Sequence, residues 1–302
     1  MAELNSTNLR QAEAKAKAVG YVSDIDLKFY KENVEVLNEV EADSIRGYVS
    51  VKTSETNFVR YDVNISKKTK AGTDNKVYPG ILTVKNEYKS IAEVGIEEAD
   101  KVVVNGDFNL YQSAQTGEEI VRYKSNYFTR LKADAEMEPV AKFDVEAFIH
   151  NIVPEVNTEG EETGRLKVHC IIPVYNGVEC MTLIAPEEIT GAIENAYEPG
   201  MTVNFEGEII NSRIEHVTEI PMLIGKPKKK VTYENKNELV ITGASEAYEE
   251  GISKENPYDS DTIKAAMEER KNKFEERKAT AQQKNTTTTK SSGAAKGRTL
   301  GF

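Results

Sequence analysis

The sequence predicts a mainly β protein made of two similar halves, each with five strands and one helix, followed by a polar C-terminal tail. Alternating apolar and polar residues recur through residues 21–245, which is the pattern of half-buried strands. The motif Val102–Phe108 returns as Val203–Ile209, so that Gly106 and Gly207 lie 101 residues apart. After Gly243 the alternation stops, and residues 282–297 are rich in Thr, Ser, Lys and Gly, a composition that cannot bury a core.

The N-terminal residues contain an Ala-rich stretch, Leu9–Val19, that favours a helix ending at Gly20. Residues 21–43 mix apolar and acidic side chains. They are consistent with a first strand or hairpin whose register the pattern does not define.

In the first half, strands are predicted where β-branched and aromatic residues alternate with polar ones. The three-residue connection Ser54–Thr56 predicts that its two flanking strands form a hairpin. The expected elements are strands at Ser44–Thr53, Asn57–Ile65 and Gly80–Val84, a short helix at Lys89–Glu93, and strands at Val102–Tyr111 and Ile120–Leu131.

The second half repeats this order. Its helix is predicted to start at a proline and to end before Pro199-Gly200. The expected elements are strands at Lys142–Ile152, Arg165–Pro173 and Val178–Ile184, a helix at Pro186–Tyr197, and strands at Met201–Ile210 and Lys230–Thr242. A charged, exposed helix is expected later, at Thr262–Ala279.

The order β-β-β-α-β-β, with a glycine inside the fourth strand where a small barrel bends sharply, resembles the OB-fold. Over residues 20–245 the chain resembles a tandem OB-fold single-stranded-DNA-binding protein of the kind encoded by tailed bacteriophages. The resemblance implies two tandem five-stranded OB-fold-like barrels with a disordered or helical C-terminal tail. The corresponding segments are an N-terminal helical segment (1–20), a first barrel (21–138), a second barrel (139–245) and a flexible basic tail (246–302).

The charge distribution separates an acidic body from a basic tail. The net charge of the chain is −11, but from Lys254 onward there are 11 Lys and Arg against 7 Asp and Glu. The two cysteines and three histidines are scattered, and the common hydrolase and nucleotide-binding motifs are missing from the sequence. We therefore expect a protein that is not an enzyme and that uses no metal or cofactor.

The candidate binding residues are cations and aromatic rings that share outward strand faces, because such a face can neutralise phosphates and stack bases. In the first half they lie on three strands, and in the second half on one. The set is Arg46, Tyr48, Lys52, Phe58, Arg60, Arg122, Lys124, Phe128, Arg130, Lys132, Arg165, Lys167 and His169. Tyr175, Arg213, Tyr233 and the lysines of residues 228–230 could add to it.

The tail ends in an apolar residue, Phe302, as do the tails with which bacterial single-stranded-DNA-binding proteins recruit replication enzymes. Here Arg298 stands where an acid would be expected, so Arg298, Leu300 and Phe302 could contact either DNA or a replication protein of phage or host.

Single-stranded DNA is the expected partner, during phage DNA replication or recombination. A virion or assembly protein built from β-barrels and a recombination or annealing mediator are the alternatives. With neither a signal sequence nor a membrane segment, a cytoplasmic location is expected, and the oligomeric state stays open.

Overall fold

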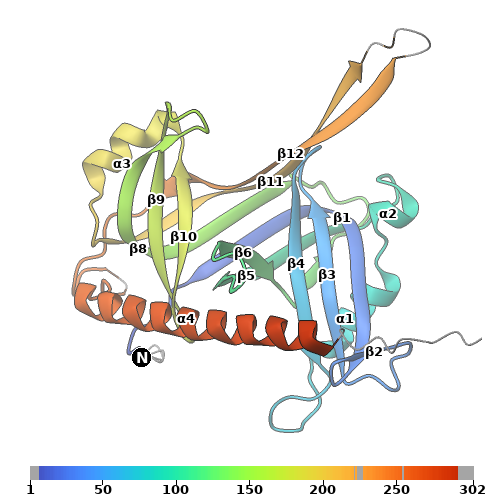
Figure 1. Ribbon diagram of the computed structural model, residues 1–302. Helices are drawn as coiled ribbons and strands as arrows, with labels where there is room; N and C mark the ends of the chain where they lie inside the picture. Colours follow the sequence, from blue (N-terminus) through green and yellow to red (C-terminus); the bar gives the residue numbers. More distant parts are fainter. Residues whose placement is uncertain (1–6, 221, 223–226, 254, 292–302) are drawn as a thin grey trace, which may run out of the picture.

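The computed structural model describes residues 7–220, 222, 227–253 and 255–291, and it is mainly β (Figure 1). Twelve strands form one continuous sheet that curls into two barrels, and a long C-terminal helix crosses both. This confirms the predicted fold class. In the part of the chain that the structure describes, no helix is long and apolar enough to cross a membrane.

The first barrel closes in the manner of an OB-fold. Its first strand pairs with the second and the fourth, the second pairs with the third, and the fifth pairs with the fourth and, in parallel, with the third. In chain order these strands are β1 (Ala14–Lys31), β3 (Ser44–Lys52), β4 (Phe58–Ser66), β5 (Lys101–Gln112) and β6 (Glu119–Lys124). The additional elements are strand β2 (Val34–Val36), helices α1 (Tyr78–Glu87) and α2 (Ile91–Val94), and strand β7 (Phe128–Arg130).

The second barrel has the same pairing, again with its third and fifth strands parallel. Its helical segment lies between the third and fourth strands, as in the first barrel. The elements are β8 (Val140–Val156), β9 (Glu162–Val174), β10 (Gly177–Ala185), the 3-10 turn η1 (Glu187–Ile189), α3 (Thr190–Ala196), β11 (Thr202–Ile220) and β12 (Lys228–Ala244). The last two strands extend well beyond the barrel as a projecting hairpin (Figure 1).

The repeated glycines occupy equivalent positions of the fourth strands and allow close packing in both barrels. A Cβ on Gly106 would lie 2.6 Å from the Lys124 carbonyl oxygen and 2.7 Å from the Tyr61 ring. A Cβ on Gly207 would lie 2.6 Å from the Phe143 ring. Both glycines are therefore required by close approach of neighbouring atoms.

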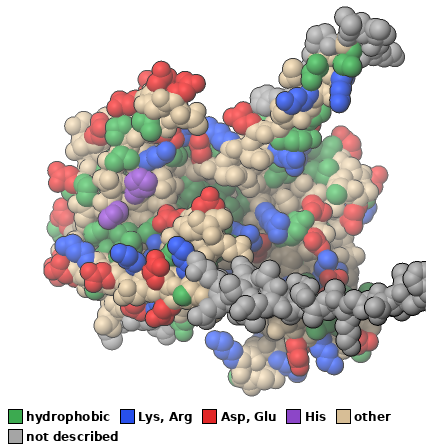
Figure 2. Space-filling model, viewed as in Figure 1, with side chains coloured by type: hydrophobic (Ala, Val, Ile, Leu, Met, Phe, Trp, Pro, Cys, Tyr) green, Lys and Arg blue, Asp and Glu red, His purple; other side chains and the backbone are tan. Residues whose placement is uncertain are grey.

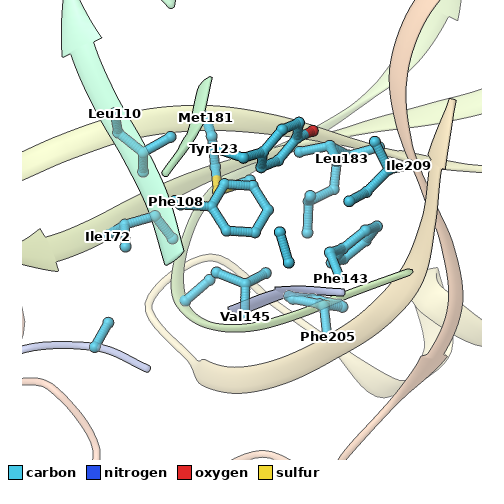
Figure 3. Packing of buried hydrophobic residues seen from close by; sticks show 14 of the residues in the cluster. Phe108, Leu110, Tyr123, Phe143, Val145, Ile172, Met181, Leu183, Phe205 and Ile209 are labelled. Carbon is cyan, nitrogen blue, oxygen red and sulfur yellow. The ribbon is translucent and has the colours of Figure 1, made fainter. Parts of the chain in front are cut away.

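The two barrels are joined through β1 and share one core. Residues 15–19 of β1 pair with β5 along one edge and with β8 along the other. Ala16 and Ala18 are buried in this three-strand junction. Phe108 and Tyr123 of the first barrel point toward Met181 and Leu183 of the second (Figure 3), and all four belong to one hydrophobic cluster. The region where the two barrels meet is therefore packed by one continuous apolar layer.

Three local predictions in the first half are wrong. The Ala-rich stretch is the start of β1, because its small side chains fit between two neighbouring strands. Residues 80–84 lie inside α1, which begins at Tyr78 with proline in its first turn. The strand expected at Ile120–Leu131 is broken after Lys124, where the Ser125 hydroxyl donates to the Asn105 carbonyl and accepts from the Tyr127 amide.

The C-terminal helix is longer than predicted and packs on the protein, so the flexible tail expected from residue 246 is wrong for its first part. Helix α4 (Ser260–Ser291) buries Ile263 and Ala266, and Tyr258 just before it is also buried. Arg270 forms ion pairs with Glu119 of the first barrel, at 3.6 Å, and Glu179 of the second, at 3.0 Å. Burial raises the pKa of Glu179.

Candidate nucleic-acid interface

Five of the predicted residues meet on the outward face of β3, β4 and β6. Strand register places Lys52 opposite Phe58, and it places Arg60 one residue before the Tyr61–Tyr123 pair that joins β4 to β6. Side chains alternate across each strand, so these residues share one side of the sheet. They are Tyr48, Lys52, Phe58, Arg60 and Arg122.

The Arg60 guanidinium lies flat over the Tyr48 ring, with its central carbon 3.6 Å from the ring centroid. The Tyr48 hydroxyl donates to Asp24 at 2.8 Å, and this hydrogen bond raises the pKa of Tyr48. Asp62 lies between two arginines, 3.5 Å from Arg60 and 3.6 Å from Arg122. Exposed ion pairs of this kind contribute at most about 1 kcal/mol, so a phosphate can compete with Asp62 for both guanidinium groups.

A groove of about 750 Å³, here called the central groove, runs between the two barrels. A smaller hollow of about 200 Å³ adjoins it and is lined by Arg60 and Arg122. The two share the lining residues Val121, Tyr123 and Asn211, so together they form one channel along the surface. Figure 2 shows Lys and Arg side chains near the centre of this face and on the projecting hairpin.

Two of the three predicted residues of the second barrel, Lys167 and His169, line the opposite wall of the central groove. Arg165 lies beside it, and acids neutralise the cations of this wall. Arg165 pairs with Glu155 at 3.2 Å and with Glu238 at 2.7 Å, and Lys167 lies 3.9 Å from Glu155. The His169 ring shares a hydrogen bond of 3.0 Å with Thr182. This wall offers hydrogen bonds rather than net positive charge.

The projecting hairpin, of which the structure describes residues 211–220, 222 and 227–236, is here called the arm. Its stack face continues from the groove-lining Asn211 and Asn237 and includes Arg213 and Tyr233, because these positions alternate on the same side. The Arg213 guanidinium carbon lies 3.9 Å from the centroid of the Tyr233 ring, which is half exposed. The arm therefore presents a second cation–aromatic stack.

Asn57, in the turn between β3 and β4, fixes the base of the arm to the first barrel. Its side-chain NH2 group donates to the Ile209 carbonyl at 2.9 Å, and its side-chain oxygen accepts from the backbone N–H of Asn211 at 2.6 Å. It also donates to the Thr53 hydroxyl at 3.0 Å. The first barrel, the groove and the arm are thus held in one arrangement.

The structure separates the remaining first-barrel residues from this surface. Phe128 packs edge to face on the buried Tyr61, with ring centroids 6.4 Å apart. It is partly buried against the core, while its neighbour Tyr127 is 65% exposed. The prediction that Phe128 points outward is wrong, because the break at Ser125 reverses the alternation.

Arg130 lies beside α1, 3.4 Å from Asp100 and 3.9 Å from Glu87, with its guanidinium over the Tyr88 ring. Lys132 follows the end of β7. Both are displaced along β5 from Arg122, since β7 pairs with residues 102–104 and β6 with residues 107–112.

Arg46 is engaged elsewhere and holds the loop after β1, donating to the Glu32 carbonyl at 2.7 Å and to Asn33 at 3.2 Å. Lys124 lines a separate cavity beneath α4. The predicted tail residues Arg298, Leu300 and Phe302 lie outside the described residues.

Sequence reasoning missed Asn57, Asp62 and Asn211, which position or line the surface. Asn57 begins a predicted strand, and a polar residue at such a place is ordinarily a turn residue. Only the contact between barrels, which no local pattern encodes, distinguishes it.

The sequence model of the YorF family matches residues 13–280. Among curated proteins none matches the chain. The solved structures that are similar to this chain include two of one protein. The wild-type single-stranded DNA binding protein from Thermus aquaticus has 7% identity and a TM-score of 0.46, over 83% of this chain and 97% of that one. A deletion mutant of that protein has 8% identity and a TM-score of 0.49, over 81% and 99%.

Proposed function

The chain belongs to the YorF family, and we propose that it binds single-stranded DNA along the central groove and the stack face of the arm, with little sequence preference. The observation that carries the proposal is the pair of cation–aromatic stacks, Arg60 on the partly buried Tyr48 and Arg213 on the half-exposed Tyr233. Rings and guanidinium planes stack on any base, and the same guanidinium groups attract phosphate.

The position of the stacks within the barrels supports this function. OB-folds bind oligonucleotides on the face of their second and third strands and with the loop between their fourth and fifth strands. Tyr48 and Arg60 lie on the second and third strands of the first barrel, and the arm joins the fourth and fifth strands of the second.

Local charge also supports it, although the whole chain is acidic. Strand register places Arg213 and Lys229 on the stack face of the arm together with Glu215, and Arg60 and Arg122 outnumber the single Asp62 between them. In contrast, Arg165 and Lys167 already have acidic partners. The first barrel and the arm would therefore provide most of the phosphate contacts, with the second-barrel wall supplying hydrogen bonds.

The more specific part of the proposal is a role in coating single-stranded DNA during phage replication or recombination. It rests on the sequence resemblance to phage proteins described above. Recruitment of a replication protein through residues 298–302 belongs to the same part of the proposal.

The test is the affinity of the double variant Arg60→Ala, Arg122→Ala for a labelled oligo(dT), followed by fluorescence anisotropy. Loss of two phosphate contacts should make the slope of log K against log salt shallower by about 1.4. Loss of the stack should in addition weaken the binding free energy by about 1–3 kcal/mol. The matched control is Lys68→Ala, Lys89→Ala, which removes two exposed cations from surface ion pairs elsewhere.

Unchanged affinity in the arginine double variant, or an equal loss in the lysine control, would contradict the proposed surface. Far-ultraviolet circular dichroism of each variant checks that the barrels are still folded.

A further inference from the structure

The loop after β1 carries an exposed apolar group on an acidic background. Residues 32–43 contain five Asp and Glu and neither Lys nor Arg. Within them Val34, Leu37 and Val40 are 68%, 96% and 92% exposed. Several aliphatic side chains left in water on one short segment are the mark of a protein contact surface. We call this segment the acidic loop.

The acidic loop is held in a defined shape. Strand β2 pairs with β1, and Arg46 donates to the Glu32 carbonyl at 2.7 Å. The Asp43 carboxylate accepts from the Glu32 amide at 2.6 Å, which lowers the pKa of Asp43. Because its backbone is already ordered, docking of the loop would cost less conformational entropy than docking of a free peptide.

The arm has a complementary surface on the side opposite its stack face, here called the outer face. Strand alternation and register place Ile214 and Ile220 there together with three lysines, Lys228, Lys230 and Lys236, and one acid, Glu234. Lys236 also lies 3.3 Å from Glu238, so Lys228 and Lys230 provide most of the positive charge. Ile214 is 36% exposed and Ile220 is 41% exposed. The two isoleucines are six residues apart, which spans about 20 Å along a strand. The outer face is therefore basic and apolar where the loop is acidic and apolar.

The acidic loop and the arm point away from each other, at the bottom and the top of the view in Figure 1. We propose that the acidic loop of one molecule docks on the outer face of the arm of a second copy of this chain. Charge complementarity and the exposed aliphatic groups of both surfaces favour this occupant over an unrelated partner. Such a contact is head to tail and does not close on itself, so it builds rows of molecules.

The outer face does not include Arg213 or Tyr233, so self-association leaves the stack face free. Neighbouring molecules on one DNA strand would then touch, and binding would be cooperative. The cooperativity rests on the proposed function, whereas the association itself does not.

The test measures association of the full chain by sedimentation velocity without DNA, using two charge-reversed variants. One is Glu35→Lys, Glu39→Lys, Glu41→Lys on the acidic loop, which leaves Asp43 in place. The other is Lys228→Glu, Lys230→Glu, Lys236→Glu on the arm. The wild type should associate with rising concentration and less so at high salt, each variant should sediment as a monomer, and their equimolar mixture should associate again.

The matched control is Glu159→Lys, Glu161→Lys, Glu162→Lys, which changes the same charge in the corresponding loop of the second barrel. It should associate as the wild type does. A wild type that stays monomeric at every concentration, variants that associate like the wild type, or a mixture that stays monomeric would each overturn the proposal. Because the contact is tested without DNA, its failure leaves the Arg60 and Arg122 experiment unaffected.

Discussion

Replacement of Gly106 by alanine tests the close packing of the fourth strand in the first barrel. The new Cβ would lie 2.6 Å from the Lys124 carbonyl oxygen, whereas real Cβ atoms essentially never approach another heavy atom within 3.0 Å. The Lys124 carbonyl must therefore retreat by about 0.4 Å or more. The Tyr61 ring, 2.7 Å away, is fully buried and has no space into which to move.

Overpacking of this kind costs about 1–3 kcal/mol, and we expect the upper part of that range because a backbone atom and a buried ring are both involved. For a chain of 302 residues, about 2 kcal/mol corresponds to a fall in Tm of roughly 3 °C. The assay is thermal and urea unfolding followed by circular dichroism. Gly207→Ala should destabilise the protein at least as much, because its Cβ would lie 2.1 Å from the Val240 carbonyl oxygen and 2.6 Å from the Phe143 ring.

The matched control is Gly243→Ala, also in a strand, whose nearest neighbour would be the Glu206 Cβ at 4.0 Å. This variant should lose less than about 0.5 kcal/mol. If Gly106→Ala were no less stable than Gly243→Ala, the explanation of the repeated glycines by close approach would be refuted.

Phe128→Ala should lower the free energy of unfolding by about 2 kcal/mol, because it removes a half-buried ring from beside Tyr61. The control Tyr127→Ala, which removes an exposed ring, should leave the free energy of unfolding unchanged. Equal unfolding midpoints for the two variants would place the Phe128 ring at the surface. Burial raises the pKa of Tyr61 above its ordinary value of 10.0. The free energy of unfolding that the buried, neutral phenol of Tyr61 supports is therefore fully present below about pH 10 and is lost as the pH rises further. Tyr61→Phe should therefore flatten the decline of unfolding free energy at alkaline pH, and a decline as steep as in the wild type would contradict this assignment. Asn57→Ala should speed amide hydrogen exchange at residues 209–213 and weaken oligo(dT) binding, because three side-chain hydrogen bonds are lost. The control Asn64→Ala, on the exposed side of β4, should change neither the exchange rate nor the affinity.

The strands of the second half were predictable because their apolar alternation matches their burial. Ala141, Phe143 and Val145 of β8 are buried while Lys142 and Asp144 are exposed, and Val168 and Cys170 of β9 are buried on either side of the partly exposed His169. The repeated motif around Gly106 and Gly207 also had a local signal. Each glycine has a buried apolar residue two positions before it and another two positions after it, such as Val104 and Phe108 around Gly106.

The first strand could not be predicted from propensity, because tertiary contacts override it. Ala is the best helix former, yet Ala16 and Ala18 lie where β1 has strands on both sides. The alternation of Lys and Ala from Ala14 to Ala18 was the available signal, since Lys15 and Lys17 are exposed while Ala16 and Ala18 are buried.

The candidate site was predictable where strand alternation holds and not where it breaks. Tyr48, Arg60 and Arg122 share a face because β3, β4 and β6 are regular up to Lys124. Beyond that point the Ser125 side chain takes over backbone hydrogen bonds, and Phe128 turns inward. The central groove depends on how the two barrels pack, which no segment of the sequence describes alone.

The central claim is that the groove and the stack face of the arm bind single-stranded DNA. The most direct measurement is a fluorescence anisotropy titration of the full chain with single-stranded and duplex oligonucleotides of equal length at two salt concentrations. If Arg60, Arg122 and Arg213 each contact a phosphate, log K should fall with log salt with a slope of about −2 or steeper. Single strands should bind more tightly than duplex, because stacking on Tyr48 and Tyr233 needs unpaired bases. Equal binding of both forms, or affinity that does not change with salt, would contradict the account.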